Sequence, residues 1–194
     1  GGFSPIMEKQ QAYNRDQLCA KCGLIADLCI CHEFPTAQFP LRFLVIRHRT
    51  EIDKLSNTGQ FLPHLFPGSQ IVEHGLESGP FDPAVLLEED RRSIVLYPDP
   101  KAHEATPELY RQLSAPIDGV AITKAPQIIL IDATWRKARR MMQRIVALRD
   151  IPKCQLSAED SFNLTSMRLR KNEDSSRRNT VEAAIECLHA FGLA

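Results

Sequence analysis

The sequence has no long apolar run. Its longest uninterrupted runs, such as 43–46 and 128–131, hold four residues. A helix that crosses a bilayer needs about 20 apolar residues, so no membrane segment is expected. No charged-then-apolar leader opens the chain, which predicts a protein that stays in the cytoplasm. Residues 1–6 lack an initiator and are expected to be a cloning remnant, with Met7 as the natural start.

Signatures of common nucleotide and hydrolase sites are also missing. None of the nine glycines forms G-x-G-x-x-G or G-x-x-x-x-G-K-[ST], which disfavours ordinary dinucleotide binding and P-loop ATP hydrolysis. There is no G-x-S-x-G elbow. The six histidines form no H-E-x-x-H pair, so a catalytic metal is not expected.

An excess of charge of either sign is absent, because 24 Lys and Arg balance 24 Asp and Glu. The balance hides an asymmetry along the chain. Residues 51–131 carry a net charge of −6, whereas residues 132–178 carry +6. Electrostatic footprints are local, so a nucleic-acid surface and a merely solvated basic helix face both fit this segment.

Four of the six cysteines gather near the start, as Cys19-Ala-Lys-Cys22 and Cys29-Ile-Cys31. Zinc prefers four thiolate or imidazole ligands in a tetrahedron, so paired cysteines predict a structural zinc site. The second pair is more tightly spaced than usual, and His32 is an alternative ligand there. A redox dithiol is the competing interpretation. Cys154 and Cys187 are isolated in apolar surroundings and are expected to be buried thiols.

The remaining chain predicts an α/β fold. Buried strands are expected at 42–47, 93–97 and 127–132, with a weaker one at 71–72. Amphipathic helices are expected at 135–148 and 180–191, a short helix at 107–113, and an interrupted helical pattern at 54–66. Continuous apolar strands that alternate with helices favour a largely parallel sheet.

Polar and aromatic groups follow three of the predicted strands: Arg47-His48, Tyr97-Pro98-Asp99 and Asp132-Ala-Thr134-Trp135. Ligands of open α/β sheets bind at the carboxyl ends of strands. The third group places an acid, a hydroxyl and the only tryptophan within four residues. Helix capping by Thr134, with Asp132 at the positive end of the helix, is the simpler explanation and is favoured on residues alone.

The last predicted helix begins with Asn179-Thr180-Val-Glu182, which matches a capping box. A basic segment, Met167-Arg168-Leu-Arg170-Lys171, precedes it. A helix start beside arginines is also suited to binding a carboxylate or phosphate.

Together, these motifs resemble the DTW-domain family, in particular its bacterial tRNA-uridine aminocarboxypropyltransferases. The resemblance is carried by Asp132-Ala-Thr134-Trp135 with the basic helix after it, by the cysteine pattern, and by four further segments: His48 with Glu51, 54–59, 96–98, and the arginine stretch with Thr180-Val-Glu182-Ala183. Arg49 stands where a proline is usual, and Asn179 where a serine is usual. The motifs span residues 19–183.

The resemblance implies transfer of the 3-amino-3-carboxypropyl group of S-adenosylmethionine (SAM) to N3 of a tRNA uridine, in bacteria the variable-loop uridine at tRNA position 47, with release of 5′-methylthioadenosine. It also implies a SPOUT-like sheet with helices on both faces and a C-terminal knot. The expected organisation is an N-terminal zinc module at 7–34 and a catalytic domain at 35–194, in a monomer with tRNA as its partner.

The resemblance and the cysteine spacing together assign residues to four groups. Asp132 is the candidate base that removes the uridine N3 proton, or alternatively a residue that only orients ligand or loop while water takes the proton. The expected SAM pocket is formed by Leu96, Tyr97, Pro98, Thr134, Trp135, Thr180, Glu182 and Ala183. The expected tRNA contacts are His48, Lys54, Asn57, Arg136, Arg139, Arg140, Arg168, Arg170 and Arg177. The expected zinc ligands are Cys19, Cys22, Cys29 and Cys31.

Three other functions fit the same residues. An RNA methyltransferase on a SPOUT-like scaffold would share cofactor and substrate class. A zinc-containing RNA-binding protein without catalysis would use Asp132 only as a cap. A zinc-stapled protein-interaction domain would have a basic helix indifferent to RNA.

Overall fold

A computed structural model describes residues 17–19, 22, 24–34, 38–52, 54, 57–116, 122–157 and 179–193. The chain divides into two compact units, Gly1–Phe34 and Pro35–Ala194. The described part of the first unit includes the cysteine cluster and the short 3-10 helices η2 (Ala26–Leu28) and η3 (Cys31–Glu33). The second unit holds the sheet and the candidate site.

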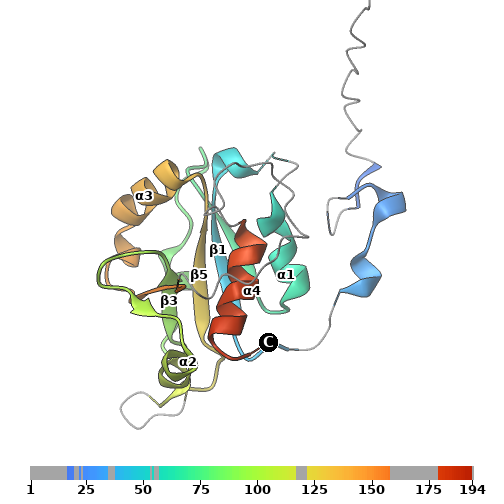
Figure 1. The fold of residues 1–194 in the computed structure, drawn as a ribbon. Helices are drawn as coiled ribbons and strands as arrows, with labels where there is room; N and C mark the ends of the chain where they lie inside the picture. The colour runs from blue at the N-terminus through green and yellow to red at the C-terminus, as the bar shows by residue number, and fades with distance from the viewer. Residues whose placement is uncertain are drawn as a thin grey trace, which may run out of the picture. The chain divides into compact units, whose positions relative to one another are not determined.

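Within the described residues, six strands of the second unit form one sheet (Figure 1). In spatial order they are β2 (Gln70–His74), β1 (Arg42–His48), β5 (Gln127–Asp132), β3 (Ser93–Leu96), β6 (Lys153–Gln155) and β4 (His103–Glu104). All five pairings between these neighbours are parallel. The predicted α/β class with a largely parallel sheet is confirmed.

The apolar residues of β1 explain why it lies inside the sheet. Phe43 and Val45 point into one apolar cluster, and Leu44 and Ile46 point into the other, on the opposite face. All four side chains are fully buried. Successive side chains of a strand alternate between faces, so an unbroken apolar run is the pattern of a strand covered on both sides.

Helices cover both faces. The cluster around Phe43 is covered by α1 (Leu62–Leu65), α2 (Pro107–Ser114) and α4 (Thr180–Ala190). The cluster around Leu44 is covered by α3 (Trp135–Arg144) and by the 3-10 helices η6 (Pro83–Leu86) and η7 (Val146–Leu148). Figure 1 shows α3 and α4 on opposite sides of β5.

Several elements differ from the sequence-based expectation. The helix predicted at 135–148 ends at Arg144, because Ile145 has an extended backbone and the chain continues as η7. The pattern at 54–66 becomes a 3-10 helix, η5 (Thr58–Phe61), followed by the single turn of α1. Another 3-10 helix, η4 (Arg49–Glu51), follows β1 directly. The short strands β4 and β6 were not predicted, since two or three residues carry no periodicity.

The expected C-terminal knot depends on the path of residues 158–178, which lie outside the described residues. None of the helices in the described part of the chain has the length and apolar character needed to cross a membrane.

Candidate functional site

The parallel strands bring the predicted strand-end residues to one edge of the sheet. In the register of β1 and β5, Arg47 is the partner of Asp132. Leu96 ends β3, the other neighbour of β5. Asp132 is therefore the last residue of a strand flanked by the ends of two others, which is where ligands of open α/β sheets bind.

A cavity of about 160 Å³ lies at this edge. Its walls come from the ends of β3 and β5, the η4 and η5 turns, and the first turn of α4. The lining residues are Glu51, Thr58, Leu96, Leu130, Ile131, Asp132, Ala133, Thr134, Asn179, Thr180 and Ala183. Five predicted site residues thus meet in one cavity: Leu96, Asp132, Thr134, Thr180 and Ala183.

Asp132 joins β5 to the start of α4. The Thr180 hydroxyl donates a hydrogen bond to Asp132 Oδ1 at 2.9 Å. Asp132 is only 9% exposed, and its Oδ2 is buried without a hydrogen-bond partner among the described residues. Burial raises the pKa of Asp132, and the nearby Glu51 charge raises it further, although hydrogen bonding by Thr180 and Asn57 opposes the shift. A carboxyl group with a raised pKa is a stronger base once ionised.

The loop after β1 packs closely against this carboxylate. A Cβ placed on Gly59 would lie 2.9 Å from Asp132 Oδ2, so the position admits only glycine without displacement of a neighbour. Asn57 holds the loop: its Nδ2 donates to the Glu51 carbonyl at 2.8 Å, and its Oδ1 accepts from the Gly59 amide at 2.8 Å. Asn57 is 2% exposed. It therefore does not lie on the surface expected to contact tRNA, and it positions the loop instead.

Glu51 was missed by the sequence reasoning as a site residue. It is 3% exposed, lines the cavity beside Asp132, and accepts a hydrogen bond from Lys54 Nζ at 2.6 Å. Lys54, an expected tRNA contact, is thus engaged by Glu51, although 42% of its side chain is exposed. The only feature of the sequence that could have indicated a site role for Glu51 is its place, with His48, in the family motif.

The predicted capping box at the start of α4 is confirmed. Asn179 Oδ1 accepts from the Glu182 amide at 2.9 Å, and Glu182 Oε2 accepts from the Asn179 amide at 2.8 Å. The Thr58 hydroxyl also donates to Asn179 Oδ1, at 3.1 Å. Glu182, expected in the SAM pocket, is engaged by the cap and does not line the cavity. Thr180 and Ala183, from the same turn of α4, do line the cavity.

The simple capping explanation for Thr134 does not hold. Thr134 occupies the N-cap position of α3, but its side chain makes no capping hydrogen bond. Thr134 is exposed and lines the cavity. Three residues expected in the SAM pocket, Tyr97, Pro98 and Trp135, do not line it. Tyr97 and Trp135 instead stack with nearly parallel planes, inclined by 8°, and with ring centroids 5.4 Å apart.

The sequence profile of the DTW domain matches residues 16–194. The chain belongs to the DTW-domain family. This family is linked to tRNA modification, so tRNA is the partner class that membership suggests. No solved structure matches the chain.

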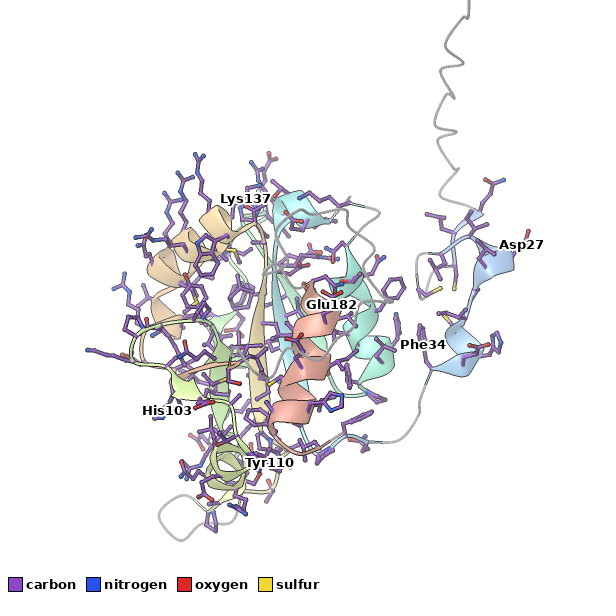
Figure 2. All side chains as sticks on the ribbon, viewed as in Figure 1. Asp27, Phe34, His103, Tyr110, Lys137 and Glu182 are labelled. Atoms are coloured by element: carbon purple, nitrogen blue, oxygen red, sulfur yellow. The ribbon has the colours of Figure 1, made fainter. Side chains whose placement is uncertain are left out.

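The DTW domain carries a basic helix next to the cavity. On α3, Arg136, Arg139 and Arg140 are exposed, whereas Ala138 and Met141 face the core. Figure 2 shows long nitrogen-tipped side chains projecting from this helix, with Lys137 labelled near its start. Three other expected tRNA contacts, Arg168, Arg170 and Arg177, lie outside the described residues.

His48 lies near the same helix at the end of β1. Its Nδ1 accepts from the Thr50 amide at 3.2 Å, and Lys137 Nζ lies 2.5 Å from the Thr50 hydroxyl. Burial lowers the pKa of His48, and the charge of Lys137 and the neighbouring His74 ring lower it further. A neutral imidazole here is a hydrogen-bonding group rather than a phosphate counter-ion.

The N-terminal unit of the DTW protein contains a candidate zinc site. The four sulfurs of Cys19, Cys22, Cys29 and Cys31 all lie within 4.8 Å of one another. The distances between Sγ atoms are 3.4 Å for Cys19–Cys29 and 3.8 Å for both Cys19–Cys31 and Cys22–Cys29. Tetrahedral Zn–S bonds of about 2.3 Å require sulfurs roughly 3.8 Å apart, so the arrangement fits zinc.

The other candidates for metal and thiol chemistry fit less well. The His32 side chain is 74% exposed, and its Nε2 lies 3.6 Å from a Glu33 oxygen, outside the sulfur cluster. The predicted burial of the two remaining thiols is confirmed, since Cys154 and Cys187 are fully buried. Burial raises the pKa of Cys154 to about 12, so this thiol stays protonated and inert.

Proposed function

We propose that this DTW-domain protein transfers the 3-amino-3-carboxypropyl group of SAM to N3 of a tRNA uridine, with position 47 as the expected target. The observation that carries the proposal is the cavity at the strand ends, where Asp132, Thr134 and Thr180 of the family motifs meet. The exposed arginines of α3 beside it support an RNA substrate. SAM is the co-substrate of this reaction.

The cavity is assigned to the amino-acid arm of SAM. Its volume of about 160 Å³ is below the roughly 300–1,000 Å³ of typical ligand sites, so it suits part of the molecule. Hydroxyls from Thr58, Thr134 and Thr180 line it and suit the arm's polar groups. The carboxylates of Glu51 and Asp132 would attract the ammonium and sulfonium groups of SAM, which are both cationic. The adenosine extends beyond this cavity.

The reaction balances without any further reagent. The uridine N3 loses its proton, N3 forms a bond to Cγ of the arm, and the Cγ–S bond breaks to release neutral 5′-methylthioadenosine. The sulfonium activates three carbons, so holding the arm decides which one reacts. Asp132 is assigned to accept the N3 proton, which its raised pKa supports. If Asp132 only orients α4, Asp132→Asn will keep the rate, because the amide oxygen still accepts from Thr180.

The N-terminal unit is assigned a structural role. Four thiolates close the coordination shell of zinc and leave no position for substrate, so the metal would stabilise this unit and help it dock tRNA. The expected domain boundaries, 7–34 and 35–194, belong to this proposal. So does the SPOUT-like knot, which an experimental structure that traces residues 158–178 tests.

The partners and setting follow from the substrate. A tRNA-modifying enzyme acts where tRNA is, so the cytoplasm is the expected location. We expect a monomer, which light scattering during gel filtration tests.

Mass spectrometry of nucleosides tests the reaction. The protein is incubated with SAM and an unmodified tRNA transcript, which is then digested. An aminocarboxypropyl-uridine together with methylthioadenosine supports the proposal. A methylated nucleoside with S-adenosylhomocysteine overturns it in favour of an RNA methyltransferase. An unchanged nucleoside profile from a protein that still binds tRNA favours a non-catalytic RNA-binding module.

A further inference from the structure

The Tyr97–Trp135 pair is a preformed aromatic surface next to the cavity. Tyr97 directly follows β3, and its amide donates to the Cys154 carbonyl at 2.8 Å, so the backbone under the ring is fixed in the sheet. The ring itself packs against the apolar cluster that includes Met141. Trp135 is the first residue of α3 and lies parallel to Tyr97. The tyrosine therefore holds the indole in one orientation.

Neither folding nor the cavity explains the exposure of Trp135. The side chain is 58% exposed, although a large aromatic ring normally gains free energy by burial. It is not a cap, because capping uses the residue before it. It does not line the cavity assigned to the amino-acid arm of SAM. One face contacts Tyr97, and the residue as a whole remains largely open to solvent.

The charges around this surface favour a nucleic acid. Trp135 is followed directly by Arg136, and Arg139 and Arg140 are exposed on the next turn of the same helix. The charge of Arg139 acts on the Tyr97 hydroxyl, where it opposes the rise in pKa caused by burial. Exposed aromatic rings interleaved with arginines form the usual surface for unpaired nucleotides: rings stack bases and guanidinium groups bind phosphates.

We propose that the exposed indole face of Trp135 stacks an unpaired base of the bound tRNA, and that Tyr97 is a positioning residue which keeps the indole in the stacking orientation. This rests on the proposed function, because the stacked base lies beside the cavity in which that function places the reacting arm. It reassigns Trp135 from the SAM pocket to RNA recognition.

Because Trp135 is the only tryptophan of the chain, tryptophan fluorescence reports on binding at this residue alone. Its fluorescence is titrated with an unmodified tRNA transcript and, separately, with SAM. We expect tRNA to quench the emission at concentrations that match its Kd. Trp135→Ala should weaken tRNA binding about 5- to 150-fold, the range that corresponds to the roughly 1–3 kcal/mol of one base–aromatic stack. SAM affinity, measured by calorimetry, should change less than about twofold.

Two further variants separate stacking from general damage. Trp135→Phe keeps a ring and should recover most of the tRNA affinity. Leu87→Ala removes an exposed apolar side chain of similar accessibility, 60%, from the residue that follows η6, and should bind tRNA like the unaltered protein. Quenching by SAM together with SAM-specific weakening in Trp135→Ala overturns the inference and places the adenine on the indole. Unchanged tRNA affinity in both Trp135 variants also overturns it. Nucleoside mass spectrometry tests the transfer reaction independently of these binding measurements. The stacking role of Trp135 and the proposed reaction can therefore be overturned separately.

Discussion

The Thr180 hydroxyl and the Asp132 carboxylate, 48 residues apart in sequence, form a hydrogen bond of 2.9 Å. It links the end of the central strand β5 to the first residue of α4, and both residues line the cavity. Asp132 Oδ2 has no hydrogen-bond partner among the described residues, so Thr180 fixes the carboxylate through Oδ1. The geometry of the candidate site therefore depends on it.

Thr180→Val should lower the free energy of unfolding by about 1–3 kcal/mol, because it leaves a buried carboxylate without its donor. Chemical denaturation measures the loss. Thr180→Ser keeps the hydroxyl and should stay close to the unaltered protein. Equal losses in both variants would show that the methyl group, and not the hydrogen bond, is what matters.

Stability should depend on pH through Asp132. In the unfolded chain this carboxyl ionises near its ordinary pKa of 3.8, whereas burial raises its pKa in the fold. The folded state thus keeps the proton longer, and the free energy of unfolding contributed by this group falls as pH rises through that window. Asp132→Asn removes this fall, so its stability relative to the unaltered protein should rise from pH 3 to pH 7. A difference that is flat with pH contradicts the assignment.

Gly59→Ala should destabilise the fold by about 1–3 kcal/mol, because the new methyl group would lie 2.9 Å from Asp132 Oδ2. A double-mutant cycle with Asp132→Ala locates the clash. The penalty of the glycine substitution should shrink in the Asp132→Ala background, which has room for the methyl group. If the penalty is the same in both backgrounds, the clash is elsewhere.

Purified protein should contain about one zinc ion per chain, measured by elemental analysis. Cys22→Ser, which alters the most buried of the four ligands, should lose the metal. The matched control is His32→Ala, which removes an exposed imidazole outside the cluster and should retain it. Loss of zinc from the His32 variant, or its retention in the Cys22 variant, contradicts a four-cysteine site.

Replacing Arg139 and Arg140 by glutamine should weaken tRNA binding and flatten its salt dependence, by roughly one unit of slope per lost phosphate contact. The control is Arg111→Gln on α2, an exposed arginine that pairs with Glu108. The control should leave both affinity and slope unchanged. An equal loss of tRNA affinity in Arg111→Gln would show that binding depends only on the overall charge of the protein.

Structural features that depend on residues close together in the sequence could be predicted. The capping box of Asn179 and Glu182 involves residues three apart, and it forms as predicted. β5, Gln127–Asp132, has the predicted bounds, because an apolar run ended by an acid is unambiguous over six residues. Family motifs then gave five of the residues that line the cavity, which no local pattern would have joined.

The direction and the partners of individual side chains could not be predicted from the sequence. Asn57 was expected to contact tRNA, and only the fold shows that its side-chain amide is used at both ends, by the Glu51 carbonyl and the Gly59 amide. Trp135 belongs to the family motif, but the motif does not reveal that its ring lies against Tyr97 and outside the cavity. Side-chain direction depends on the packing of β3 against β5, which the sequence order hides.

Transfer of the aminocarboxypropyl group to tRNA in the Asp132 cavity can be tested directly. The most direct test compares the unaltered protein with Asp132→Asn on one unmodified tRNA transcript with SAM, and quantifies the modified nucleoside and the released co-product. We expect equal amounts of aminocarboxypropyl-uridine and methylthioadenosine from the unaltered protein, and formation of both products at least about 100-fold slower in the variant. A methylated nucleoside with S-adenosylhomocysteine, or equal rates from the two proteins, would contradict this expectation.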